Sequence, residues 1–135
     1  MSQPRSCLAL ILLFDQFPRN MFRGTARAFA TDSNALTAGR HAIAHGFDAI
    51  LSSVESAFIY LPFEHSERLD DQLESMRLYR ALAGDDPALA GYVAYAEQHL
   101  NVIRRFGRFP ARNAILGRSS TPAELEFLAG GKSAP

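Results

Sequence analysis

The chain uses one motif twice, first as Asp15-Gln-Phe-Pro-Arg-Asn-Met-Phe-Arg-Gly-Thr25 and later as Arg108-Phe-Pro-Ala-Arg-Asn-Ala-Ile-Leu-Gly-Arg-Ser119. Because proline fixes φ and has no amide hydrogen, each copy is expected to end a helix or to open a turn. The glycine of each copy tolerates positive φ, and the asparagine can bond its own backbone. Each copy therefore predicts a rigid turn that presents arginine side chains.

Length and composition indicate one globular domain, expected over residues 1–130 and followed by a loose tail over 131–135. Hydrophobic residues make up 47% of the 135 residues and charged residues 21%, which is ordinary for such a domain. Fourteen basic and fourteen acidic residues cancel, so no net field draws the chain to nucleic acid or to a membrane. Cys7 is the only cysteine, which excludes an intrachain disulfide and fits a cytoplasmic protein.

The charges are unevenly distributed along the chain. Residues 19–27 and 104–118 together carry eight arginines and no carboxylate, whereas residues 64–74 carry five carboxylates and one arginine. Thirteen of the fourteen basic residues are arginine, which can bind a carboxylate or a phosphate through two parallel hydrogen bonds. The pattern favours either ion pairs between these regions or a site for an anion.

The first apolar run, residues 7–14, is expected to form a buried helix. It is apolar on every side, so periodicity does not separate helix from strand, but leucine and alanine favour helix and β-branched residues are scarce. The run is also much shorter than the ~20 residues of a membrane-spanning helix. We therefore interpret it as core and expect no membrane anchor.

Five further helices are predicted from capping residues, glycine stops and apolar spacing. They are expected from Thr31 or Asp32 to Gly46, over about 53–61 before Pro62, from a Ser66 cap to Gly84, from Asp86-Pro87 to Gly107, and from a capping box at Thr121-Pro122-Ala123-Glu124.

Apolar spacing also predicts which side of each helix is buried. The expected inward positions include Val54 in the third helix, Leu69 and Leu73 in the fourth, and Leu125 in the last. Asp71 belongs to the side of the fourth helix that is expected to face solvent.

The fold class is predicted as all-α, with about six helices paired as antiparallel hairpins. No segment alternates in the manner of a strand, and every connection between helices is short. No period of about 34 residues repeats, so spacing alone does not indicate a tetratricopeptide array.

Four long strings of the sequence carry a resemblance. They are Leu-Phe-Asp-Gln-Phe-Pro-Arg-Asn at 13–20, Arg-Gly-Thr-Ala-Arg-Ala-Phe-Ala-Thr-Asp at 23–32, Tyr-Leu-Pro-Phe-Glu-His-Ser-Glu at 60–67, and the second copy of the motif within 105–118. They closely resemble a bacterial family catalogued as domain of unknown function 924, over about residues 8–130. The resemblance implies an all-helical fold similar to tetratricopeptide repeats in cytoplasmic proteins, and it implies no established activity.

The chain departs from this family pattern at its N-terminus. Family members usually begin with a further helical segment that contains a Phe-Trp-Phe-like stretch and more tryptophan, whereas this chain has no tryptophan. We therefore expect a chain that lacks this first part and leaves apolar surface uncovered around residues 8–14. Such a surface predicts a homodimer or a poorly soluble chain.

Glu64 and His65 are the candidate acid–base pair of an enzyme, because a carboxylate beside an imidazole can supply groups that titrate near neutral pH. The alternative is that His65 or Ser66 simply caps a helix. His41 and His45 have the spacing of metal ligands, but they lie opposite the apolar stripe with no carboxylate between them, so no metal site is predicted. No cofactor is expected, since the sequence contains no Gly-rich phosphate loop and no zinc-ligand spacing.

The candidate ligand-binding residues come from the two turns. They suit two roles that do not exclude each other: an ion-pair network that ties the turns to residues 64–74, or a pocket in which guanidinium groups and turn amides hold a phosphate or carboxylate. Nucleic acid is disfavoured as a partner by the zero net charge. The candidate residues are Arg19, Asn20, Arg23, Arg108, Arg112, Asn113 and Arg118.

Two functions from different classes follow from these residues. The first is a helical binding module that recognises a small anionic ligand or an acidic peptide through the arginine-rich turns. The second is a hydrolase-like enzyme in which Glu64 and His65 form the acid–base pair and the arginines act as electrostatic clamps.

The two turns are expected to meet in space near residues 62–65. Phe17 and Phe109 each precede a proline, so their rings are expected to fill neighbouring gaps in the core. Arg19 and Arg112 are then expected to share one acidic or anionic partner, with Glu64 as the expected protein carboxylate.

Overall fold

The computed structural model describes residues 1–131, in which the chain forms six α-helices, three short 3-10 helices and no β-strand. The all-α prediction is thereby confirmed, whereas a tetratricopeptide-like arrangement stays a prediction. Residues 132–135 of the expected tail lie outside the described residues. The elements are α1 (Pro4–Met21), η1 (Ala26–Phe29), α2 (Asp32–Ala44), α3 (Ser53–Glu64), α4 (Leu69–Ala83), η2 (Pro87–Leu89), α5 (Ala90–Phe106), η3 (Pro110–Arg112) and α6 (Pro122–Ala129).

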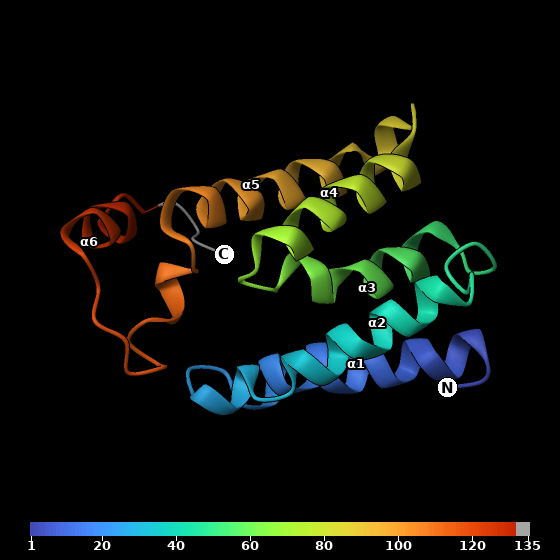
Figure 1. Cartoon of the computed structure of the whole chain (residues 1–135), viewed down its shortest axis with the longest axis horizontal. Coiled ribbons are helices and arrows are strands. Elements are labelled where there is room, and N and C mark those ends of the chain that lie inside the picture. Colours follow the sequence, from blue (N-terminus) through green and yellow to red (C-terminus); the bar gives the residue numbers. More distant parts are fainter. Residues whose placement is uncertain (132–135) are drawn as a thin grey trace.

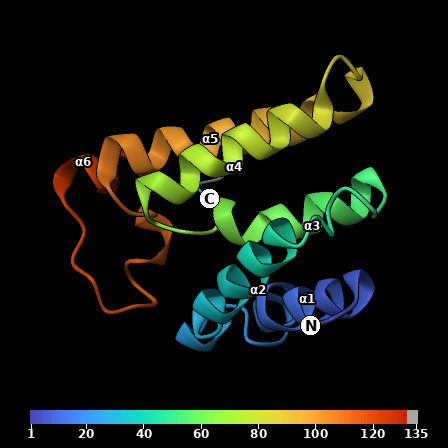
Figure 2. The same ribbon diagram turned by 45° about the vertical axis from the view of Figure 1, so that its right-hand side comes forward.

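Helix α3 occupies the centre of the fold. It packs against α1 and α2 on one side and against α4 and α5 on the other, as Figures 1 and 2 show. Its sequence suits this place, because Ala57, Ile59, Tyr60 and Phe63 are all buried. A capping box at its start was not predicted: Ser52 accepts a hydrogen bond from the Glu55 amide, and the Glu55 carboxylate accepts one from the Ser52 amide. No helix within residues 1–131 has the length and apolar character needed to cross a membrane.

Small residues allow α2 to approach α3 closely. The buried face of α2 consists of Ala35, Ala38, Gly39 and Ala42. A Cβ added at Gly39 would lie 3.1 Å from the carbonyl oxygen of Ile59 and 3.2 Å from a ring carbon of Phe63. The contact between these helices therefore depends on the missing side chain of Gly39.

Two prolines that were expected to end helices lie inside them instead. Helix α1 continues through Pro18 to Met21, and α3 continues through Pro62 to Glu64. Pro18 has no amide hydrogen for the carbonyl of Phe14, one turn earlier. The hydroxyl of Thr31 donates a hydrogen bond to that carbonyl at 2.6 Å, so the helix loses no partner at this position.

Helix α4 buries Met76, Tyr79 and Ala83 as predicted, but its first two turns differ from the prediction. Leu69 and Leu73, expected inside, are 46% and 43% exposed, whereas Asp71, expected outside, is 2% exposed. Polar contacts explain the burial of Asp71, because its carboxylate forms an ion pair with Arg40 and accepts a 2.7 Å hydrogen bond from the Ser66 hydroxyl. Ser66 does not cap α4, because the residue before this helix is Arg68.

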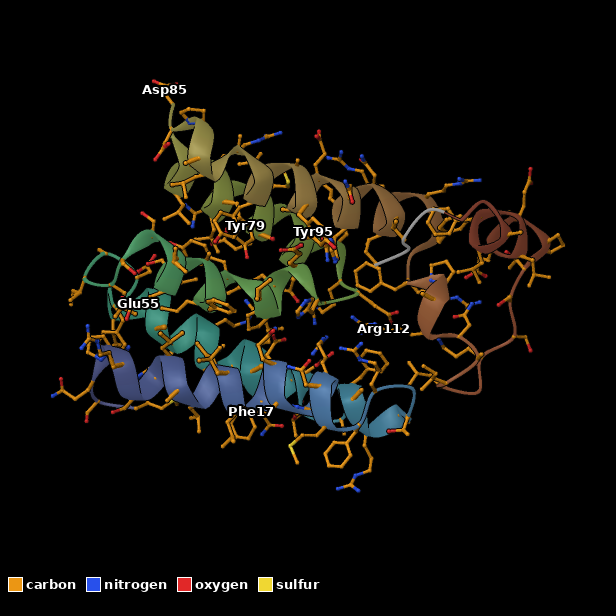
Figure 3. The ribbon with its side chains drawn as sticks, turned by 180° about the vertical axis from the view of Figure 1, so that it is seen from behind. Phe17, Glu55, Tyr79, Asp85, Tyr95 and Arg112 are labelled. Atoms are coloured by element: carbon orange, nitrogen blue, oxygen red, sulfur yellow. The ribbon has the colours of Figure 1, made fainter. Side chains whose placement is uncertain are left out.

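Three other predictions about buried side chains were wrong. Val54 lies in the first turn of α3 and Leu125 near the start of α6, and both are exposed, at 55% and 57%. Phe17 is 52% exposed and forms an uncovered apolar stripe on α1 with Leu13 and Met21; Figure 3 shows it pointing away from the other helices. Phe109, in contrast, is fully buried as expected.

The close contact at Gly39 gives a stability prediction. Ala is normally favoured over Gly in a helix by about 1 kcal/mol, but at residue 39 it overpacks the contact with α3. Gly39→Ala should therefore lower the free energy of unfolding by about 1–3 kcal/mol in chemical denaturation. Gly91→Ala is the matched control, because a Cβ added at this position in α5 meets no atom within 4 Å. It should raise stability by about 0.5–1 kcal/mol. Equal effects of the two substitutions would contradict this account of the contact.

Candidate functional site

A cleft of about 400 Å³ lies beside the second copy of the motif, which contributes Arg112 and Leu116 to its lining. Its walls come from η1, the start of α2, the end of α3 with the residues that follow, and η3 with the loop after it. The lining includes Phe29, Asp32, Leu36, His65, Glu67 and Arg112.

One carboxylate joins the two copies of the motif. Nη1 and Nη2 of Arg19 lie 2.6 and 3.0 Å from the two oxygens of Asp32, and Nη1 of Arg112 lies 3.4 Å from Oδ2 of the same carboxylate. The expectation that Arg19 and Arg112 share a partner is therefore confirmed. Glu64 was the wrong carboxylate, because its side chain turns towards α5 whereas Asp32 lies in the first turn of α2.

Arg112 packs against two aromatic rings. Its guanidinium carbon lies 4.5 Å from the ring centroid of Phe29 and 4.8 Å from that of Phe109, and its Nη2 donates a 2.8 Å hydrogen bond to the carbonyl of His65. Its side chain is only 12% exposed, and burial lowers its pKa because it disfavours the charged form. Figure 3 shows Arg112, the last residue of η3, between the α1–α2 side of the molecule and the helices above it.

His65 pairs with Asp15, not with its neighbour Glu64. Nδ1 of His65 donates a 2.6 Å hydrogen bond to Oδ1 of Asp15, which is almost completely buried. Burial alone would raise the pKa of Asp15, but the hydrogen bond and charge of His65, together with Arg19, lower it. Since Nδ1 is engaged, Nε2 is the ring nitrogen left for another partner.

Glu64 lies in a second acid–imidazole pair. Its Oε1 is 2.9 Å from Nδ1 of His99, but that nitrogen is directed to the carbonyl of Tyr95 at 2.8 Å, so Oε1 accepts no well-aligned hydrogen bond among residues 1–131. The rings of His65 and His99 lie 6.2 Å apart. The predicted acid–base pair of Glu64 and His65 is therefore wrong, because these neighbours at the end of α3 point to different partners.

Three predicted binding residues form ion pairs or hydrogen bonds within the C-terminal part of the chain, or between it and Glu67. Arg118 binds both oxygens of Glu67 at 2.8 and 2.9 Å, and Arg108 binds both oxygens of Glu124 at 2.9 and 2.8 Å. Asn113 is buried and donates to Glu124 at 3.0 Å. These side chains bind carboxylates within the protein. They therefore fit the ion-pair network that was one of the two roles predicted for the arginine clusters.

Two predicted residues lie outside the site. Asn20 and Arg23 are exposed at and just beyond the end of α1, and neither side chain has a hydrogen bond or ion pair with another described residue.

His41 and His45 stack on each other with ring centroids 4.0 Å apart. Within residues 1–131 no group of three or more His, Cys, Asp or Glu side chains is arranged to hold a metal ion.

Sequence reasoning missed several members of the site. Asp15 lies four residues before Arg19, and this i, i+4 spacing of opposite charges was a usable signal. Asp32 was assigned only a capping role, although its own side chain caps nothing here. No local signal marks His99 or Phe29, because their partners are distant in the sequence.

Comparison with known proteins gives two matches. A family described as "Bacterial protein of unknown function (DUF924)" matches residues 1–132. The solved structure of a protein of unknown function, ATU0120 from Agrobacterium tumefaciens, is similar, with a TM-score of 0.88 and 44% sequence identity over 96% of this chain and 70% of that chain. No curated protein matches the sequence.

The ion pair of Glu67 gives a pH-dependent prediction. Burial would raise the pKa of this carboxyl, but hydrogen bonds from Arg118 and the Phe109 amide lower it. A lowered native pKa contributes stability that is present above the unfolded pKa, near 4.3, and is lost as pH falls through the native value. Glu67→Gln should therefore destabilise by about 1–3 kcal/mol at pH 7.

The difference in unfolding free energy between wild type and Glu67→Gln should shrink as pH falls below about 4. Urea denaturation from pH 7 to pH 3 measures it. Glu126→Gln is the matched control, because Glu126 is exposed and forms no ion pair with another described residue. A difference that stays constant down to pH 3 would mean that the charge of Glu67 does not matter.

Proposed function

We propose that this chain, which belongs to the DUF924 family of bacterial proteins of unknown function, binds a small anionic ligand in the cleft beside Arg112. The observation that carries the proposal is the burial of Arg112, a cation that packs against two aromatic rings and has one ion pair, at 3.4 Å, among the described residues. The cleft volume of about 400 Å³ falls in the range of small-molecule sites and favours a small ligand over an acidic peptide.

The charges around the cleft support this proposal. Arg19 and Arg118 each bind both oxygens of a carboxylate within the protein. Arg112 bonds a backbone carbonyl and lies 3.4 Å from an oxygen of Asp32 that Arg19 already holds. A guanidinium group has five N–H donors, so three of those of Arg112 are without a partner among residues 1–131. A buried cation with free donors is suited to an anionic oxygen.

His65 offers a second contact for the ligand. Its ring lines the cleft, and Asp15 holds Nδ1 as the donor, so Nε2 carries a lone pair in the neutral ring. That nitrogen can accept a hydrogen bond from a hydroxyl or an acid proton of a ligand. A ligand that contacts both Arg112 and His65 is therefore expected to carry an anionic group and a nearby donor.

An enzyme is the second candidate, and the Asp15–His65 hydrogen bond is the observation that favours it. In such a pair the imidazole takes a proton at Nε2, and the carboxylate stabilises the imidazolium that forms. In the cleft this arrangement suits activation of a water molecule for hydrolysis of a bound ester or anhydride. Glu64 has no part in this version, because its side chain faces His99.

A thermal-shift screen tests the binding proposal. A panel of small carboxylates and phosphate monoesters at millimolar concentration should contain compounds that raise the melting temperature by several degrees, since a ligand at 100 times its Kd adds about 2.7 kcal/mol. Arg112→Met should abolish that shift. Arg23→Met is the matched control, because Arg23 has no partner in the described structure, and it should retain the shift. Circular dichroism verifies that the variants fold.

An unchanged shift in folded Arg112→Met would refute the site. If that variant fails to fold, His65→Gln serves in its place, because it leaves Arg112 present and should weaken binding of the anions that also carry a hydrogen-bond donor for Nε2; unchanged binding of those anions would refute the site.

The enzyme candidate predicts turnover that depends on His65. Any ester or anhydride that binds should be hydrolysed by wild type, while His65→Gln and Asp15→Asn should reduce kcat by about 10²–10⁴-fold. His41→Gln is the control, because His41 lies at the opposite end of α2 from the cleft and should leave the rate unchanged. Full turnover in His65→Gln would eliminate this mechanism.

A further inference from the structure

We infer that the cleft selects an amphiphilic monoanion, a small carboxylic acid with an apolar body, over phosphate monoesters. This inference rests on the proposed function and adds the chemical class of the ligand. Three features of the cleft carry it: apolar walls, two carboxylates in the lining, and the direction from which the guanidinium of Arg112 can be approached.

The walls of the cleft are largely apolar. Phe29 comes from η1, Leu36 from α2, Pro62 from α3 and Leu116 from the loop after η3. Because these four residues come from four separate segments, a ligand body in the cleft meets apolar surface on several sides. A small inorganic ion would leave this surface in water, whereas a hydrocarbon body would bury it.

The carboxylates in the lining limit the charge of the ligand. Asp32 and Glu67 both line the cleft, and each is already bound by an arginine. Arg112 is the buried cation of the lining, and it is partly offset by Asp32 at 3.4 Å. The other arginine of the lining, Arg68, is 75% exposed and lies 3.9 Å from Asp71, so water and this carboxylate screen its charge. A phosphate monoester carries almost two negative charges at neutral pH and would bring the second one close to these carboxylates. A single negative charge therefore fits better.

The geometry of Arg112 favours a planar head group. The rings of Phe29 and Phe109 lie within 5 Å of its guanidinium carbon, so aromatic rings take up space that a ligand would need to stack on it. A ligand that hydrogen-bonds to the guanidinium approaches in its plane, because all of its N–H groups lie in that plane. A carboxylate is planar and matches two parallel N–H donors in that plane.

The test measures affinity by calorimetry with two matched series. The first is acetate, butyrate, hexanoate and octanoate, and the second is inorganic phosphate, butyl phosphate and hexyl phosphate, all at pH 7.5. Hexanamide serves as the uncharged control. We expect carboxylate affinity to rise about fourfold for each CH₂ until the cleft is full, which corresponds to ~0.8 kcal/mol for each buried CH₂. Hexyl phosphate should bind at least tenfold more weakly than hexanoate, and hexanamide should not bind.

Leu116→Ser tests the apolar wall separately from the head-group site. Leu116 lines the cleft but is partly exposed, so its replacement should leave the fold intact. The variant should still bind carboxylates through Arg112 but lose much of the gain in affinity from acetate to octanoate. Leu125→Ser on α6 is the matched control, because that leucine is exposed and does not line the cleft, and it should keep the full chain-length dependence.

The outcomes separate the two proposals. If phosphate esters bind as tightly as carboxylates, or if affinity does not change with chain length, the inference fails while anion binding at Arg112 stands. If no anion in either series binds, both the inference and the proposed function fail. If hexanamide binds as tightly as hexanoate, the charge plays no part and Arg112 is not the head-group site.

Discussion

The structure depends on the sharing of Asp32 by Arg19 and Arg112. This carboxylate lies at the start of α2. Both of its oxygens bind Arg19 of the first copy of the motif, and one of them lies at a longer distance, 3.4 Å, from Arg112 of the second copy. Arg19 also contacts Asp15 at 3.2 Å and is therefore paired with two carboxylates, whereas Arg112 forms its one ion pair among the described residues with the shared carboxylate, at 3.4 Å. The sharing of Asp32 joins the two copies of the motif and leaves Arg112 available for a ligand, so one interaction has both a structural and a functional result.

Helix positions were predictable from the sequence because their signals are local. Asp86 caps the turn that leads into α5, Gly107 ends α5 in the left-handed conformation, and Thr121 and Glu124 form the predicted capping box. The burial pattern in the first turns of α4 was not predictable, although Met76, Tyr79 and Ala83 further along the helix are buried as expected. It depends on the pairing of Asp71 with Arg40, which lies 31 residues away, and this pairing outweighs the burial of two leucines.

Only part of the site was predictable, because the motif is a local signal whereas the partners of its arginines are distant in the sequence. The repeated motif identified Arg19 and Arg112 and indicated that they share a partner, because arginine-rich turns require counter-charges. It did not identify the carboxylate, since several acidic residues were available and the sequence has no rule for choosing among them. The neighbouring Glu64 and His65 looked like a pair in the sequence, but adjacent residues at a helix end point in different directions. His65 therefore pairs with Asp15 on α1, and the side chain of Glu64 lies beside His99 on α5.

The contacts that form the site are also the contacts between the most distant parts of the chain. Arg112 and Asp32 are 80 residues apart, Arg118 and Glu67 are 51 apart, and His65 and Asp15 are 50 apart. The pairings of α1 with α2, α2 with α3, α3 with α4 and α4 with α5 join successive helices. Closing a long loop costs more entropy than closing a short one, so local hairpins form before distant ion pairs. We therefore expect the helical hairpins to assemble first and the cleft with its arginines to be completed last, on a scaffold that already exists.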